Sequence, residues 1–127
     1  MNKILENIET AYRSGLVENT PDYMCTEKAK GMIKGVLGEN LDEVMQGCIT
    51  ESAKIVPGVV PQAFFIESSF NYLLGRGEVT EWAQKTGDEN YIDPMIYMTL
   101  VGVFAKEYAK EQGWIKQDGD KVQVTYN

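Results

Sequence analysis

The most constraining feature of the sequence is a long apolar segment near its C-terminal end. From Met95 to Ala105 nearly every residue is apolar, and Asp93-Pro94 precedes this run with the pattern of a helix N-cap followed by proline in the first turn. A helix that is apolar on nearly every side has to be surrounded by other elements. The run is shorter than the roughly 20 residues that cross a bilayer. We therefore expect a helix buried within the domain or at a dimer contact, and no membrane insertion.

This helix is expected to cover residues 94–112 and to end at Gly113. Charged residues restore a polar face in its last turns: Lys106, Glu107, Lys110 and Glu111. Earlier in the chain, apolar residues recur at helical spacing in five more segments, which end near glycine or proline. These expected helices cover residues 4–14, 21–37, 41–56, 62–74 and 78–86. Thr20-Pro21 predicts the start of the second helix, and Asn40 is the expected cap of the third.

The C-terminal residues change from helical spacing to alternation. Val122, Val124 and Tyr126 alternate with polar residues after Asp118-Gly119, which is typical of a β-hairpin. The sequence thus predicts a mainly α fold with minor β, namely a compact bundle of about six helices with a C-terminal β-hairpin. We expect a single globular domain over residues 1–127, helical over 1–112, with the hairpin at 114–126. Residues 59–61 are expected to form a connector.

Three glycines in the second expected helix allow two interpretations. Gly31, Gly35 and Gly38 would align on one side of a continuous helix and admit another backbone closely. Each would also cost about 1 kcal/mol relative to alanine, so the helix could instead be broken near Gly35. The sequence does not decide between a helix contact and a broken helix.

The residue types present exclude most familiar catalytic sites. The chain has no histidine, which is the side chain most used for proton transfer near neutral pH and the commonest metal ligand. Its two cysteines, Cys25 and Cys48, are too far apart in sequence for a compact metal or redox motif, and we expect both to be buried, reduced thiols. We assign no catalytic, cofactor-binding or metal-binding residue.

The balance of charge bears on the class of partner. The formal net charge of −7 opposes direct binding to nucleic acid or anionic lipid, because such partners favour clustered lysine and arginine. The acidic residues either form a solubilising surface or provide a face that docks on a partner with a basic surface. The N-terminal residues 1–6 lack the apolar core of a secretory signal, so we expect a cytoplasmic protein.

Aromatic residues are concentrated in the middle third of the chain, more than a small interior is expected to enclose. We therefore assign candidate partner-binding residues to this region: Glu67, Asn71, Tyr72, Arg76, Trp82 and Tyr91. Glu67 lies either among phenylalanine rings or on a solvated polar stripe. Arg76 either binds an anionic group or belongs to a simple Gly-Arg-Gly helix stop.

These observations favour an interaction protein over an enzyme. We expect an adaptor or inhibitor that binds another protein, one form of which is an acidic decoy for a basic nucleic-acid-binding groove. The alternative is a small-ligand binder or unusual enzyme with a pocket between the aromatic helices, anchored by Glu67, Asn71 and Arg76. A third interpretation, a winged-helix DNA-binding protein, rests on the hairpin alone, and the acidic charges oppose it. The sequence does not decide whether the protein forms a homodimer.

Overall fold

The structure is built around one central helix, α6 (Pro94–Gln112). It is a computed structural model that describes residues 3–19, 25–55, 58–87 and 93–125. Within these residues the chain forms six α-helices, one 3-10 helix and one three-stranded sheet. The other elements are α1 (Lys3–Arg13), α2 (Glu27–Leu37), η1 (Gly38–Asn40), α3 (Leu41–Ile55), β1 (Val59–Pro61), α4 (Gln62–Arg76), α5 (Val79–Gly87), β2 (Ile115–Asp118) and β3 (Lys121–Val124). The predicted mainly α fold with minor β is confirmed.

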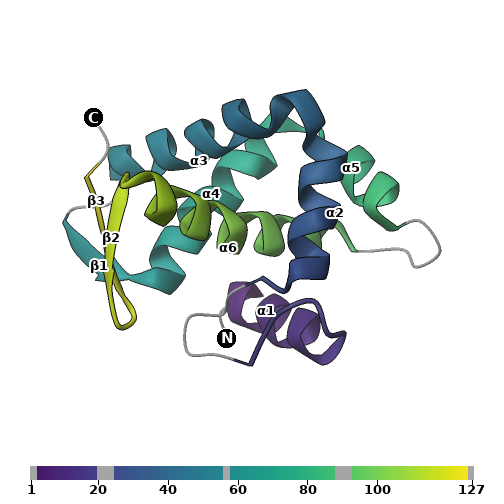
Figure 1. Cartoon of the computed structure of the whole chain (residues 1–127), viewed down its shortest axis with the longest axis horizontal. Helices are drawn as coiled ribbons and strands as arrows, with labels where there is room; N and C mark the ends of the chain where they lie inside the picture. The colour runs from purple at the N-terminus through teal and green to yellow at the C-terminus, as the bar shows by residue number, and fades with distance from the viewer. Residues whose placement is uncertain (1–2, 20–24, 56–57, 88–92, 126–127) are drawn as a thin grey trace.

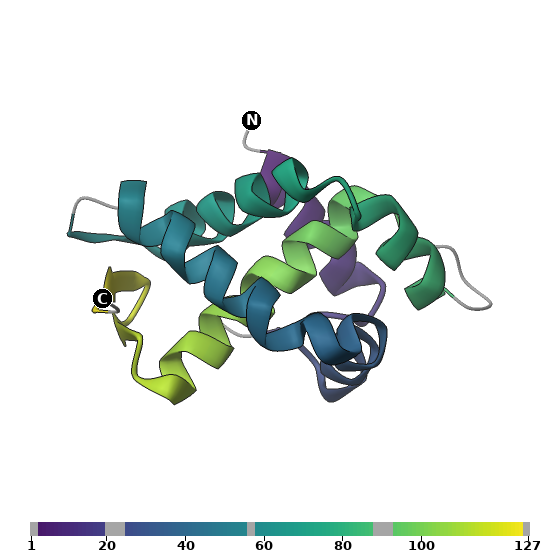
Figure 2. The same ribbon diagram turned by 90° about the horizontal axis from the view of Figure 1, so that it is seen from above.

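Other elements surround α6 along its length. Figure 1 shows α3 on one side of α6 and α1 on the opposite side, with the sheet at one end and α2 and α5 at the other. Seen from above, α3 crosses over α6 (Figure 2). At Gly102 a Cβ atom would lie 3.2 Å from the backbone oxygen of Ile66, so the missing side chain lets α4 approach closely. The expected position of this helix at the centre of the domain is confirmed.

The ends of α6 are those that the sequence predicts. The Asp93 side chain accepts a hydrogen bond from the backbone N–H of Met95 at 2.8 Å, and Pro94 occupies the first turn. Gly113 ends the helix with a φ of 76°, a left-handed conformation that glycine adopts without strain.

We predicted a polar, exposed face of four charged residues at the end of α6, and this prediction is wrong for two of them. Lys106 is fully buried and Glu107 is 7% exposed. Lys106 Nζ donates to Gln62 Oε1 at 2.9 Å and forms an ion pair with Glu107 at 3.2 Å. Gln117 of β2 donates to the same Gln62 oxygen at 3.2 Å, so this buried polar cluster joins α6, α4 and the sheet.

The expected start of the second helix is also wrong. Thr26, not Thr20, is the N-cap of α2, and its side chain accepts from the backbone N–H of Ala29 at 3.2 Å. Cys25 pairs with Val17 in an isolated antiparallel bridge, so the chain is extended where the sequence predicted helix. Thr20-Pro21 itself lies outside the described residues.

The third helix begins without the expected cap. Asn40 belongs to η1, which runs directly into α3, so it does not cap a free helix end. The helical spacing of apolar residues in α3 produces a core face on which Val44, Met45, Cys48, Ile49 and Ser52 are buried, while Leu41 at the start of the helix is partly buried.

Residues 59–61 form a strand and not a connector. Strand β1 pairs antiparallel with β3, Val60 opposite Val122, and gives the sheet order β1-β3-β2. The predicted hairpin is confirmed as β2 and β3, which turn at Gly119. The third strand covers an edge of a hairpin that would be marginal on its own. None of the helices in the described part of the chain has the length and apolar character needed to span a membrane.

The buried pair on α6 gives a test of this arrangement. In a Lys106→Met variant the Glu107 carboxylate stays buried without its ion pair, so the free energy of unfolding should fall by about 3–5 kcal/mol. The double variant Lys106→Met/Glu107→Gln should lose much less, because no unpaired buried charge is left. Urea denaturation followed by circular dichroism measures both. A single variant within about 1 kcal/mol of the wild type would contradict the account.

Candidate binding site between α3 and α4

A groove runs between α3 and α4 on the surface of the domain. It has a volume of about 330 Å³ and is lined by Glu51, Asn71, Tyr72, Gly75 and Arg76. The three side chains from α4 are at positions that helical spacing brings near one another. Asn71, Tyr72 and Arg76 were all predicted as partner-binding residues, so the structure brings half of that set together in one groove.

Gly47 of α3 makes room for the Tyr72 ring. A Cβ atom at position 47 would lie 2.1 Å from Tyr72 Cζ and 2.1 Å from its hydroxyl oxygen, far inside van der Waals contact. The ring therefore rests directly on the backbone of α3, and this contact sets how closely α3 and α4 pack at the groove. Sequence reasoning did not single out Gly47, although a lone glycine inside a helical pattern was a signal for such a close approach.

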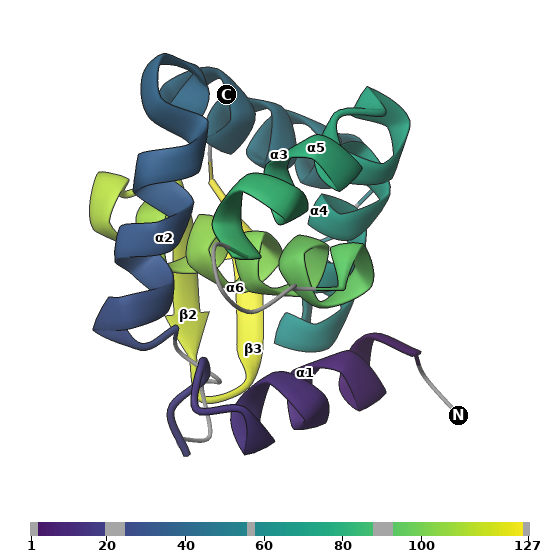
Figure 3. The same ribbon diagram turned by 90° about the vertical axis from the view of Figure 1, so that its right-hand side faces the viewer.

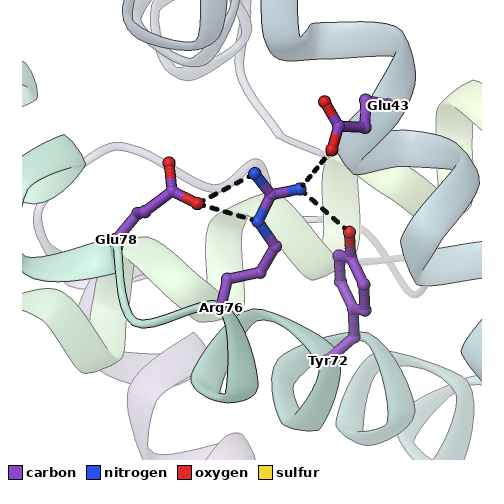
Figure 4. A network of polar contacts seen from close by, with 4 residues as sticks. All are labelled: Glu43, Tyr72, Arg76 and Glu78. Carbon is purple, nitrogen blue, oxygen red and sulfur yellow. Dashed lines mark hydrogen bonds and ion pairs between the residues drawn. The ribbon is translucent and has the colours of Figure 1, made fainter.

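Arg76 joins three helices at one end of the groove. Its Nε and Nη2 donate to Glu78 Oε1 at 3.0 and 2.8 Å, and its Nη1 donates to Glu43 Oε1 at 3.2 Å and to the Tyr72 hydroxyl at 3.1 Å. Figure 4 shows the guanidinium held between Glu78 on one side and Glu43 and Tyr72 on the other. The hydrogen bonds with Tyr72 and Glu78 raise the pKa of Arg76 above its ordinary value. Four donor contacts are thus already made within the chain.

Trp82 lies beneath Arg76 and not on the surface. The Arg76 guanidinium carbon is 5.7 Å from the centre of the Trp82 ring, within the range of a cation–π interaction. Trp82 is only 4% exposed, so the expectation that its ring contributes to an exposed aromatic patch is wrong. The reason is that α5 turns this ring toward the core together with Val79 and Ala83.

The helix stop that the Gly-Arg-Gly pattern suggested is confirmed. Arg76 is the last residue of α4, and Gly77 caps the helix with a φ of 78°. The side chain of Arg76 is 18% exposed, and its role within the chain is to hold α3, α4 and the start of α5 together.

The outer face of α4 carries the remaining candidate residues. Glu67 and Asn71 are both exposed and lie one turn apart, so the solvated interpretation of Glu67 is confirmed. Phe64 and Leu74 flank them on the same face and are 42% and 58% exposed. We call Phe64, Glu67, Asn71 and Leu74 the α4 stripe. Phe64 and Leu74 were not among the predicted partner-binding residues, although their spacing from Glu67 and Asn71 indicated a shared face. Tyr91 lies outside the described residues.

Carboxylates dominate the surroundings of the α4 stripe and the groove. Glu43 and Glu51 of α3 and Glu78 before α5 border the groove, and Glu67 lies on the stripe itself. Arg76 is bonded to two of these carboxylates, and Lys54 lies 3.7 Å from Glu51. Four carboxylates against two cations leave this surface with net negative charge.

The two cysteines are buried in the core, as predicted. Both are free and buried, and Cys25 Sγ donates to the backbone oxygen of Leu100 at 3.3 Å. Burial raises the pKa of both thiols to about 12. At neutral pH they are protonated and are poor nucleophiles or metal ligands. Among the described residues no group of three or more His, Cys, Asp or Glu side chains is placed to hold a metal ion.

Comparisons of the chain with protein-family models, with curated proteins and with solved structures found no match.

A substitution at Gly47 tests how the groove is built. Gly47→Ala should lower the free energy of unfolding by about 1–3 kcal/mol, because the new methyl group displaces the Tyr72 ring and its hydrogen bond with Arg76. Gly75→Ala is a matched control, since the same methyl group there meets no atom within 4 Å. The control should raise stability by up to about 1 kcal/mol. Equal effects of the two substitutions in urea denaturation would contradict this account.

The buried thiols predict a loss of stability at alkaline pH. Unfolding lets both thiols ionise near their ordinary pKa of 9.0, whereas in the folded chain they ionise near 12. The stabilisation is fully present below pH 9 and is lost as the pH rises toward 12. Urea denaturation at pH 8 and about pH 10.5 measures this loss, and a Cys25→Ala/Cys48→Ala variant should show a smaller one. An identical loss in that variant would count against the thiols as its source.

Proposed function

We propose that this chain is a protein–protein interaction module that docks on a basic surface of another protein through the α4 stripe. The observation that carries the proposal is the composition of that stripe. Two exposed apolar side chains, Phe64 and Leu74, flank two polar ones, Glu67 and Asn71, on a single helix face. An apolar contact bordered by polar groups is the usual composition of a protein interface.

The charge around the stripe favours a basic partner. Glu67 lies on the stripe, Glu51 lines the adjoining groove together with Asn71, and Glu43 is paired with Arg76 at one end of that groove. The chain as a whole carries a net charge of −7. Such a surface attracts a partner rich in lysine and arginine and repels phosphate backbones. Arg76 supports the site by holding α3 against α4. Its guanidinium is already bonded to Glu43, Tyr72 and Glu78, so we assign it no direct contact with the partner.

An adaptor and an inhibitor can be distinguished by whether the partner surface that they cover is itself a nucleic-acid-binding site. In the inhibitor form, the acidic face occupies a basic groove that otherwise binds nucleic acid, so added nucleic acid competes for the partner. In the adaptor form, nucleic acid has no effect on the complex. We expect this module to act in the cytoplasm and to do no chemistry of its own.

Affinity capture from the source organism's lysate tests the proposal. Wild-type protein should retain a basic partner, and both Leu74→Asp and Glu67→Lys should weaken retention at least tenfold. The first replaces an apolar contact with a charge that has to be desolvated, and the second reverses the charge of the stripe. Raising the salt concentration should also weaken retention. Glu9→Lys on α1 is the matched control, since it makes the same charge change on another exposed helix.

The control should retain the partner as the wild type does. The thermal unfolding midpoints of all variants should agree closely, because the substituted side chains are exposed. Equal retention by Glu67→Lys, Leu74→Asp and Glu9→Lys would show that the α4 stripe is not the docking surface.

A further inference from the structure

The α4 stripe adjoins the α3–α4 groove along part of its length. Asn71 belongs to both, since it lies on the stripe and also lines the groove of about 330 Å³. Phe64 and Leu74 form the two ends of the stripe and are ten residues apart, which is about 15 Å along a helix. The surface is therefore long and narrow, with an exposed apolar side chain at each end and polar side chains between them.

The spacing within the stripe is that of a helix face that packs lengthwise on another helix. Its members follow one another at intervals of three, four and three positions: Phe64, Glu67, Asn71 and Leu74. These are the intervals of the a and d positions that form the seam of a coiled coil. At the crossing angle of about 20° that such packing favours, two helices stay in contact over several turns. One helix of another molecule can therefore contact the whole stripe.

Other common modes of peptide recognition do not fit this surface. An added β-strand needs an exposed sheet edge, and a helix face offers none. A phosphorylated or acidic segment needs free arginine side chains, whereas the guanidinium of Arg76 is already bonded within the chain. A proline-rich segment needs a groove lined by several aromatic rings, and Tyr72 is the single aromatic residue that lines this one. The mode that remains is a helix laid along α4.

Charge determines the composition of that helix. Glu67 lies within the stripe, is exposed, and forms no ion pair with any residue that the structure describes. Glu51 adds a second carboxylate in the adjoining groove. A Lys or Arg that faces Glu67 would form an ion pair that the chain itself does not supply. A second copy of this chain fits less well, because each copy carries a net charge of −7.

The opposite side of the domain differs in charge. In Figure 3, α2 lies on one side of α6 and α4 on the other. Helix α2 continues through Gly31 and Gly35, so the interpretation of a helix broken near Gly35 is wrong. Lys28 and Lys34 are exposed on α2, and Lys85 lines the groove beside it. These lysines disfavour a basic partner on the α2 side, whereas Glu67 and the groove favour one on the α4 side.

We propose that the basic partner docks on the α4 stripe with an amphipathic α-helix of its own. This inference rests on the proposed function, since it names the element of the partner that the stripe binds. The partner helix presents two apolar side chains about ten residues apart, one against Phe64 and one against Leu74. Between them a Lys or Arg pairs with Glu67, and a polar side chain faces Asn71. The bound helix thus has at least about 11 residues, or three turns.

Photo-cross-linking from the two ends of the stripe tests the shape of the bound segment. A benzophenone amino acid, which is apolar, replaces Phe64 in one preparation of the full chain and Leu74 in another. Both preparations are irradiated in the source organism's lysate, and mass spectrometry locates the labelled residues of the partner. The two labelled positions should lie in one segment, about 8–12 residues apart, because a helix advances about 1.5 Å per residue. An extended strand covers the same distance in about 4–5 residues.

The outcomes separate this inference from the proposed function. Labelled positions about 4–5 residues apart, or positions in different segments of a basic partner, would overturn the bound helix and leave the docking surface in place. Adducts with a second copy of this chain, or no adduct from either position, would overturn both. The same replacement at Glu9 of α1 is the matched control and should give no adduct.

A charge swap tests the ion pair with Glu67. The Lys or Arg of the partner that lies between the two labelled positions is replaced by glutamate, which should weaken retention by the wild-type chain about tenfold. Combining this partner variant with Glu67→Lys should restore most of the retention, whereas combining it with Glu9→Lys should restore none. A labelled segment without a Lys or Arg between the two positions, or a swap that restores nothing, would overturn the pairing with Glu67.

Discussion

The burial of α6 on all sides from Tyr97 to Glu107 determines how the other elements pack. An apolar helix that exposes no face needs neighbours in every direction, and the chain supplies them as α1, α3, α4, α5 and the sheet. Each of these helices then has one face against the core and one outside. The outer faces of α2 and α4 carry the features that the core does not explain: exposed apolar side chains on α4 and open glycines on α2.

Local patterns in the sequence were sufficient to predict most of the fold. The helices α1, α3, α4, α5 and α6 follow from apolar residues at helical spacing and from the glycine or proline near their ends. Two local signals competed at the start of α2, since Thr20-Pro21 and Thr26 both fit an N-cap. Strand β1 was missed because three residues carry little periodicity, and its pairing with β3 depends on residues about 60 positions away.

The candidate site was also predictable only in part, because contacts between distant segments leave no local pattern in the sequence. Asn71, Tyr72 and Arg76 lie on one helix, so their proximity follows from spacing alone. The opposite wall of the groove comes from α3, and nothing local to α4 indicates that Tyr72 rests on Gly47 or that Arg76 bonds to Glu43. The burial of Trp82 and Lys106 likewise depends on packing between distant segments.

Site-specific photo-cross-linking measures the proposed contact between the α4 stripe and a partner. Asn71 is replaced by a benzophenone amino acid, and the same replacement is made at Glu9 of α1 in a second preparation. A covalent adduct with one basic protein is expected from position 71 and none from position 9. Equal adducts from both positions, or an adduct from position 9 alone, would contradict it.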